Sequence, residues 1–284
     1  MPRIEKLRLK LGKTVWRFLC PATVMALLSP SAFATWSVIA IDSNTNEMVV
    51  ASATCVTQEE FRDAGLGGLM DVQAIVAPGK GIAVAQAYVD VTGESQQLIY
   101  DELMNGNTPE NILEIRKDHR RIERYQYAIG DIQGRIETFS GSRNLGVSIA
   151  EEGVVPDKQI YFSVQGNTLR SRAVVFEAVK AFRSNSGNIT DRVMAAMRTA
   201  DENGGDRRCS CENAPIPNMP CTTKNAHVAY ILKVDGESEA GESFNDGEYA
   251  LYINVTEQNT SSSENANPVI TLDLRYQEWK RVND

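Results

Sequence analysis

The sequence lacks an apolar run long enough to span a membrane. Its N-terminal run, Phe18–Leu28, covers about ten residues, whereas a helix crossing a hydrocarbon core of ~30 Å needs about 20. Basic residues precede this run, and the small-x-small sequence Ala32-Phe33-Ala34 follows it. We therefore predict a signal peptide at 1–34, cleaved after Ala34, with an uncleaved amphipathic anchor as the alternative. The basic residues are Arg3, Lys6, Arg8, Lys10, Lys13 and Arg17.

Basic charge is also scarce. The chain has 29 Lys and Arg against 37 Asp and Glu, and residues 35–284 retain 23 basic and 36 acidic residues, a net charge of −13. Such a balance repels nucleic acid and anionic lipid surfaces, and no basic stripe with interleaved aromatics is present. We therefore expect no nucleic-acid partner and no membrane anchor after cleavage.

Internal repeats and breaks in composition are absent as well. The length of 35–284 suits one domain with a full core. The signal peptide places this domain in the periplasm or outside the cell, where it is a monomer or a homo-oligomer.

Strand patterns occupy the two ends and the middle of the domain. Apolar runs at 35–41 and 48–55 predict a hairpin whose faces are both covered. Strands, then helices, then strands, helices and strands again predict an α+β fold of two packed sheets flanked by helices. Residues 56–73 and 140–157 are interpreted as connectors, and 256–284 as an exposed loop and a C-terminal tail. Further strands are predicted at 74–77, 81–88, 125–130, 135–139, 160–164, 226–234 and 249–255, and helices at 92–105, 108–117, 174–182 and 189–200.

Four cysteines remain after cleavage: Cys55, Cys209, Cys211 and Cys221. An exported protein meets an oxidising compartment, so disulfides are the expectation. Three pairings are open, although Cys209 and Cys211 are too close in sequence to favour bonding to each other. A zinc site formed by Cys209, Cys211, Cys221 and His227 is the alternative to disulfides, but its Cys-x-Cys spacing is tighter than usual. We predict no metal and no cofactor.

Several short motifs follow one another in a distinctive order. They are Thr35-Trp36-Ser37-Val38-Ile39-Ala40, Val49–Ser52, Asp118-His119-Arg120, Val164-Gln165-Gly166-Asn167 with Leu169, and Gly204-Gly205-Asp206-Arg207-Arg208. In this order the chain resembles a bacterial family, domain of unknown function 1028, which is grouped with the N-terminal nucleophile (Ntn) hydrolases. The resemblance implies a four-layer αββα sandwich and a mechanism class, but no substrate. The chain departs from the family at Cys209-Ser210-Cys211, which opens a longer loop, and after Gly141.

Thr35 is the residue on which the functional interpretation depends. Cleavage after Ala34 places its hydroxyl and a new α-amine on one residue, a nucleophile with its own base. The hypothesis is that the Thr35 hydroxyl attacks an amide or ester carbonyl. The alternative is that Thr35 is merely the residue left by signal peptidase.

Other motif residues supply the candidate supporting groups. The Gly166 N–H and the Asn167 amide are the candidate oxyanion donors. Asp206 and Arg207 are candidates for orienting the amine or binding an acidic group of the substrate, and His119 is a weaker candidate. Each has a structural alternative: a turn in which Asn167 caps a helix, an ion pair between Asp206 and Arg207, and a charged His119 at a helix end.

The sequence thus predicts an exported Ntn-type hydrolase that acts on a small molecule or peptide. The alternative is a non-catalytic exported binding or assembly protein that retains the fold.

Overall fold

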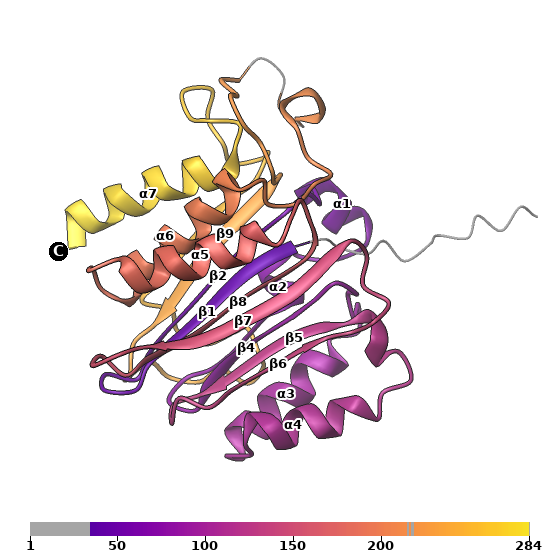
Figure 1. Cartoon of the computed structure of the whole chain (residues 1–284), viewed down its shortest axis with the longest axis vertical. Helices are drawn as coiled ribbons and strands as arrows, with labels where there is room; N and C mark the ends of the chain where they lie inside the picture. The colour runs from indigo at the N-terminus through magenta and orange to yellow at the C-terminus, as the bar shows by residue number, and fades with distance from the viewer. Residues whose placement is uncertain (1–34, 215, 217–218, 284) are drawn as a thin grey trace, which may run out of the picture.

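Two antiparallel sheets face each other in the computed structural model, which describes residues 35–214, 216 and 219–283 (Figure 1). The six-stranded sheet has the order β10-β9-β2-β1-β8-β7, and the four-stranded sheet the order β3-β4-β5-β6. The strands are β1 Thr35–Asp42, β2 Glu47–Thr54, β3 Ala74–Ala77, β4 Gly81–Gln86, β5 Gln126–Asp131, β6 Ile136–Ser140, β7 Val147–Val155, β8 Ile160–Leu169, β9 Val228–Val234 and β10 Leu251–Val255.

Strand β1 lies inside the six-stranded sheet, between β2 and β8. Successive side chains of a strand point to opposite faces. Trp36 and Val38 therefore pack in the core beneath the helices, whereas Ile39 and Ile41 pack against the four-stranded sheet. This explains the uninterrupted apolar run in the sequence, because both faces are covered.

Two groups of helices pack on the outer faces of the two sheets (Figure 1). α5 (Ala173–Ser184), α6 (Ile189–Glu202) and α7 (Pro268–Asn283) cover the six-stranded sheet. α3 (Glu94–Met104) and α4 (Pro109–Lys117) cover the four-stranded sheet. The predicted start of α4 is confirmed, since Thr108 caps the Asn111 N–H and Pro109 is the first helical residue. The remaining elements are α1 (Gln58–Asp63), α2 (Leu69–Gln73) and the 3₁₀ turns η1 (Ile122–Arg124) and η2 (Cys211–Asn213).

Part of each predicted connector is regular structure. Residues 147–155 form edge strand β7, whose side chains are mostly half-exposed, so it carries no apolar pattern. In the connector at 56–73, α1 begins with a capping box between Thr57 and Glu60.

The C-terminal residues differ from the expected exposed loop and tail. Residues 268–283 form α7, and Val269, Leu272 and Tyr276 are buried against the six-stranded sheet. The charged residues that suggested a tail are interspersed with these buried positions along the helix.

The predicted signal peptide, residues 1–34, lies outside the described residues. Within 35–214, 216 and 219–283, no helix has the length and apolar character needed to cross a membrane.

The four cysteines form two disulfides, Cys55–Cys209 and Cys211–Cys221. This selects one of the three open pairings and confirms that Cys209 and Cys211 bond elsewhere than to each other. The zinc hypothesis is wrong, because its three thiolates are consumed in disulfides. Among the described residues, no group of three or more His, Cys, Asp or Glu is placed to hold a metal ion.

The double variant Cys55→Ser/Cys209→Ser tests the longer crosslink, which joins residues 154 apart in sequence. Removing it should lower the free energy of unfolding by about 2–4 kcal/mol, because the unfolded chain regains loop entropy. Cys211→Ser/Cys221→Ser is the matched control, and its loss should be smaller because the separation is 10 residues. Urea denaturation measures both, and equal midpoints for wild type and the Cys55/Cys209 variant would contradict the prediction.

Candidate functional site

The space between the sheets has an apolar half and a polar half. Along the inner face of β1, Ile41 and Ile39 belong to the apolar core between the sheets, and Ser37 and Thr35 continue the same face toward the start of the strand. All four side chains are almost completely buried. The start of β1 therefore lies in a buried polar environment.

Glutamines from the four-stranded sheet link the two sheets in this polar half. Gln86 Oε1 accepts hydrogen bonds from Ser37 Oγ at 2.8 Å and Gln73 Nε2 at 2.7 Å. Gln86 Nε2 donates to Gln126 Oε1 at 2.7 Å, and Gln126 Nε2 donates to the Gly166 carbonyl at 3.1 Å. Since buried polar groups are costly unless hydrogen-bonded, these bonds fix the side chains in position.

The network extends along the six-stranded sheet. Gln165 Nε2 donates to Ser37 Oγ at 2.6 Å, and Ser163 Oγ donates to Gln165 Oε1 at 2.6 Å. Tyr230 Oη donates to Gln73 Oε1 at 3.0 Å. Sequence reasoning missed this layer, because isolated glutamines in apolar strands give no signal until the sheets face each other.

Thr35 lies at the Asn167 end of this layer. β1 pairs with β8 so that Trp36 faces Gly166, and one further step in this register places Thr35 opposite Asn167. Thr35 Oγ1 donates to Thr54 Oγ1 at 3.4 Å, and Asn167 Nδ2 donates to Gln126 Oε1 at 3.4 Å. Thr35 and Asn167 are each only 1% exposed. In the full chain the Thr35 nitrogen is a peptide amide, so the predicted α-amine exists only after cleavage.

Gly166 and Asn167 lie within β8 and do not form the alternative turn at a helix start. Gly166 pairs with Trp36 on one side and Ile149 on the other, so its backbone lies inside the sheet. A Cβ at Gly166 would lie 2.7 Å from the Leu169 side chain. Gly166 thus has a packing role, and the Asn167 amide is the side-chain donor on this side of Thr35.

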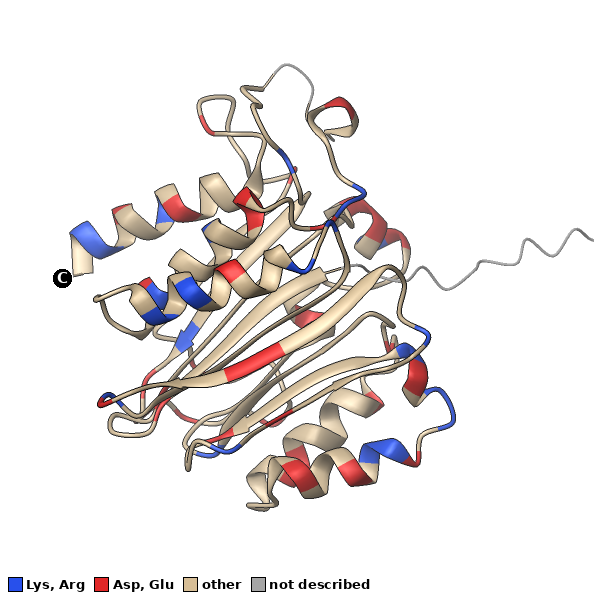
Figure 2. Ribbon diagram, viewed as in Figure 1, with Lys and Arg blue, Asp and Glu red and all other residues tan. Residues whose placement is uncertain are grey.

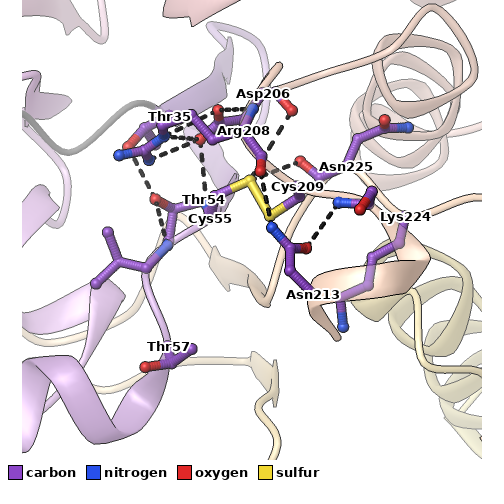
Figure 3. The surroundings of a disulfide bond; sticks show 12 residues. Thr35, Thr54, Cys55, Thr57, Asp206, Arg208, Cys209, Asn213, Lys224 and Asn225 are labelled. Atoms are coloured by element: carbon purple, nitrogen blue, oxygen red, sulfur yellow. Dashed lines mark hydrogen bonds and ion pairs between the residues drawn. A yellow bond between two sulfur atoms is a disulfide. The ribbon is translucent and has the colours of Figure 1, made fainter. Parts of the chain in front are cut away.

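Asp206 is buried, and its partner is Arg208 (Figure 3). The two side chains form an ion pair at 2.7 Å, and the Asp206 carboxylate also accepts from the backbone N–H groups of Arg208 at 3.0 Å and Cys55 at 3.3 Å. Burial raises the pKa of Asp206, and the hydrogen bonds and charge of Arg208 oppose that rise. Figure 3 shows the Arg208 guanidinium beside Thr35 and Thr54.

The ion pair between Asp206 and Arg207, considered from the sequence as the structural alternative, is wrong, because Asp206 pairs with Arg208. Asp206 forms a β-bridge with Leu169, and the chain then turns at Arg207 and Arg208, where the Asp206 carboxylate accepts from the Arg208 N–H at 3.0 Å. Arg208 therefore lies with Asp206. Arg207 is exposed and lies against Gly146, where an added Cβ would be 3.2 Å from the guanidinium carbon. The signal for Arg208 in the Gly-Gly-Asp-Arg-Arg motif was the tendency of an Asp side chain to hydrogen-bond the backbone two residues further on.

The second glycine of the motif, Gly205, allows a close approach to Trp36. A Cβ at Gly205 would lie 2.6 Å from the Trp36 ring. Trp36 is fully buried directly after Thr35, so this contact helps to fix the start of β1.

His119 follows α4 and is half-buried. Its Nδ1 accepts from the Arg121 N–H at 3.2 Å, and burial together with the Arg116 charge lowers its pKa. This geometry favours a neutral imidazole over the charged helix cap considered from the sequence. His119 lines a cavity of about 200 Å³ to which neither Thr35 nor Asn167 contributes.

A second cavity, of about 250 Å³, reaches Asn167. Its lining includes Tyr88, Arg124 and Arg143, which also line an adjoining cavity of about 350 Å³. These arginines come from connectors without a motif, so nothing in the sequence pattern groups them. The remaining lining residues of the smaller cavity are Ala87, Asn144 and Leu145.

Two residues beside this cavity have a strained backbone. Ala87, in the lining, has φ +74°, and Thr168, next to Asn167, has φ +54°. The left-handed region is unfavourable for residues with a Cβ, particularly a β-branched one, and costs about 1–3 kcal/mol. Such strain gathers at functional sites, where surrounding structure maintains it.

Arg208→Gln should lower the free energy of unfolding by on the order of 2 kcal/mol at about pH 7, because it leaves the buried Asp206 carboxylate without its partner. Arg207→Gln, at the exposed neighbouring position, is the matched control and should change stability by less than about 0.5 kcal/mol. Chemical denaturation measures the free energy of unfolding of both variants. Equal losses for Arg208→Gln and Arg207→Gln would contradict the ion pair between Asp206 and Arg208.

The same variant should show a pH dependence of known sign. Because the pKa of folded Asp206 lies above its ordinary value of 3.8, the folded state holds the proton more tightly than the unfolded chain. That contribution to stability is complete below 3.8 and is lost as the pH rises through the folded pKa. In Arg208→Gln the opposing charge and hydrogen bonds are lost, so the pKa of Asp206 rises further and more stability is regained on protonation. Lowering the pH from about 7 to about 5 should therefore narrow the difference in free energy of unfolding between Arg208→Gln and wild type. A widening difference would contradict the prediction.

Comparisons with known proteins agree on one family. Residues 35–240 match the family described as "Family of unknown function (DUF1028)". The fold is similar to the crystal structure of a DUF1028 protein from Silicibacter pomeroyi, with a TM-score of 0.61 and 18% identity over 86% of this chain and 85% of that chain. No curated protein matches. Since the match covers most of the domain, from Thr35 onward, the chain belongs to the DUF1028 family.

Proposed function

We propose that this protein is an exported hydrolase of the Ntn type, in which Thr35 becomes the nucleophile once residues 1–34 are removed. The observation that carries the proposal is the position of Thr35. It is the first residue of a central strand and continues the strand face that lies between the two sheets, in register with Asn167. The order of helices, sheet, sheet and helices is consistent with the αββα sandwich of that class.

The proposed chemistry uses both groups of Thr35. Its Oγ attacks an amide or ester carbonyl, and the Oγ proton passes to the α-amine directly or through a water. An α-amine has a reference pKa of about 8, so a useful fraction is uncharged near neutral pH. The amine then protonates the leaving group, and water hydrolyses the acyl-Thr35 ester in the second half of the reaction.

Asn167 and Arg208 are the proposed supporting groups. The Asn167 amide would donate to the developing oxyanion, a contribution on the order of 3 kcal/mol. The guanidinium of Arg208, beside Thr35 in Figure 3, would favour the uncharged α-amine, because a nearby cation lowers the pKa of an amine. Asp206 holds this guanidinium in place.

Export and activation would then be one event. The nucleophile has no base while Thr35 is joined to residue 34, so the protein would stay inert until signal peptidase acts. Two disulfides are typical of exported proteins and support a periplasmic or extracellular location. Cell-wall peptides, acylated amino acids and acyl lactones are therefore suitable substrate panels.

The mature protein, purified from the exported fraction, should begin at Thr35 with a free amine. Intact-mass measurement and N-terminal sequencing check this directly. A mature protein that starts at any other residue would exclude Thr35 as an N-terminal nucleophile and favour the non-catalytic alternative.

A β-lactone electrophile should label the mature protein once, at Thr35, because a hydroxyl with an adjacent base is a more reactive nucleophile than the other Ser and Thr hydroxyls of the protein. Thr35→Ala should lose labelling, and Thr35→Ser should retain it because the hydroxyl remains. Thr45→Ala, at an exposed turn, is the matched control and should label like wild type. Equal labelling of Thr35→Ala and wild type, measured by mass spectrometry, would remove Thr35 from the mechanism.

A further inference from the structure

Four arginines and one tyrosine line the same cavity on this acidic protein. Arg120, Arg121, Arg124 and Arg143 line a cavity of about 350 Å³ together with Tyr88. We call these five residues the arginine cleft. Figure 2 shows its basic segments in the connection after α4 and in the loop between β6 and β7, at one edge of the molecule. A concentrated positive field on a chain of net charge −8 marks a place where an anion is favoured.

Protein carboxylates leave most of this charge uncompensated. Within the described residues, Arg120, Arg124 and Arg143 form no ion pair. Glu123 is the one acidic residue lining the larger cavity, and its carboxylate accepts hydrogen bonds from the Ser142 N–H at 2.7 Å and Ser142 Oγ at 2.6 Å. These two bonds, and more weakly the charge of Arg143, lower the pKa of Glu123, which keeps it an anion. One carboxylate facing four arginines leaves a net positive cavity.

Two of the guanidinium groups contact the Tyr88 ring. Arg121 and Arg124 lie over its ring, with guanidinium carbons 5.6 and 5.9 Å from the ring centroid, and Arg121 also donates to Tyr88 Oη. The ring packs edge-on against Tyr125, with centroids 5.2 Å apart. Cations held over an aromatic face are partly preorganised, so less freedom is lost when they bind a ligand.

The cleft adjoins a cavity that reaches one of the candidate catalytic residues. Tyr88, Arg124 and Arg143 also line this cavity of about 250 Å³, and so does Asn167. Asn167 lies opposite Thr35 in the register of the sheet. A small molecule with its anionic end at the arginines would extend toward Thr35, whereas a cavity of this size is too small for a macromolecule.

We propose that the arginine cleft binds the oxyanion, a carboxylate or a phosphate, of a small-molecule ligand. Planar guanidinium groups match both groups through paired hydrogen bonds. If Thr35 is the nucleophile proposed above, this ligand is the substrate, and the cleft selects amides or esters that carry an acidic group. That last step rests on the proposed function, but the oxyanion site itself does not.

Isothermal titration calorimetry of the mature protein with glutarate, and separately with inorganic phosphate, tests the site. Saturable binding of at least one probe is expected, and the stronger probe identifies the source of the oxyanion. Arg124→Gln and Arg143→Gln should each weaken that binding about tenfold, the effect of losing one charge-assisted hydrogen bond. Arg281→Gln removes the same charge from α7, far from the cleft in sequence, and should bind like wild type.

Urea midpoints confirm that each variant is folded. If one of the two cleft variants does not fold, the other is compared with Arg281→Gln for binding of the probe. No saturable binding of either probe, or equal binding by the cleft variants and Arg281→Gln, would overturn the proposal. Thr35→Ala should bind the probe as wild type does. Arginine variants that lose binding but keep β-lactone labelling separate the cleft from the nucleophile, so the two proposals fail independently.

Discussion

The interaction on which the structure depends is the chain of hydrogen bonds between the two sheets. Gln86 and Gln126 reach across from the four-stranded sheet to Ser37 and the Gly166 carbonyl of the six-stranded sheet. An apolar layer would bury more hydrocarbon, but it would leave no room for polar chemistry at the start of β1. The glutamines instead satisfy one another, so the sheets stay together around a polar interior. This places Thr35 in a rigid, dehydrated environment where hydrogen bonds and charges act strongly.

A second set of contacts holds the start of β1 from the side. The segment after α6 brings Gly205 against Trp36 and pairs Asp206 with Arg208. The Cys55–Cys209 disulfide ties the same segment to the end of β2. Residues distant in the chain thus converge beside Thr35, which explains why one short motif contains a packing glycine, a buried acid and its counter-charge.

Sequence patterns predicted the elements whose side chains face a core. They failed for elements whose side chains form no regular apolar pattern. β1, β2 and the helices from α3 to α6 were predicted within a few residues, since burial on a definite face leaves an apolar period. Strand β7 was missed because an edge strand with half-exposed side chains has no apolar pattern. Helix α7 was missed because its buried apolar positions, such as Leu272 and Tyr276, are spread among charged residues. At the site, motif order singled out Thr35, Asn167 and Asp206, but the choice between Arg207 and Arg208 required knowing that the chain turns directly after Asp206. The arginine cleft depends on loops meeting in space, which no local pattern encodes.

The central claim is that Thr35 Oγ is a nucleophile and that its acyl ester forms between the two sheets, beside Asn167. A crystal structure of the mature protein after treatment with a β-lactone tests this most directly. We expect an ester on Thr35 Oγ, with its carbonyl oxygen within hydrogen-bonding distance of Asn167 Nδ2 and its acyl chain in the cavity lined by Tyr88 and Arg124. An adduct on another residue, or a Thr35 ester that points away from Asn167, would contradict it.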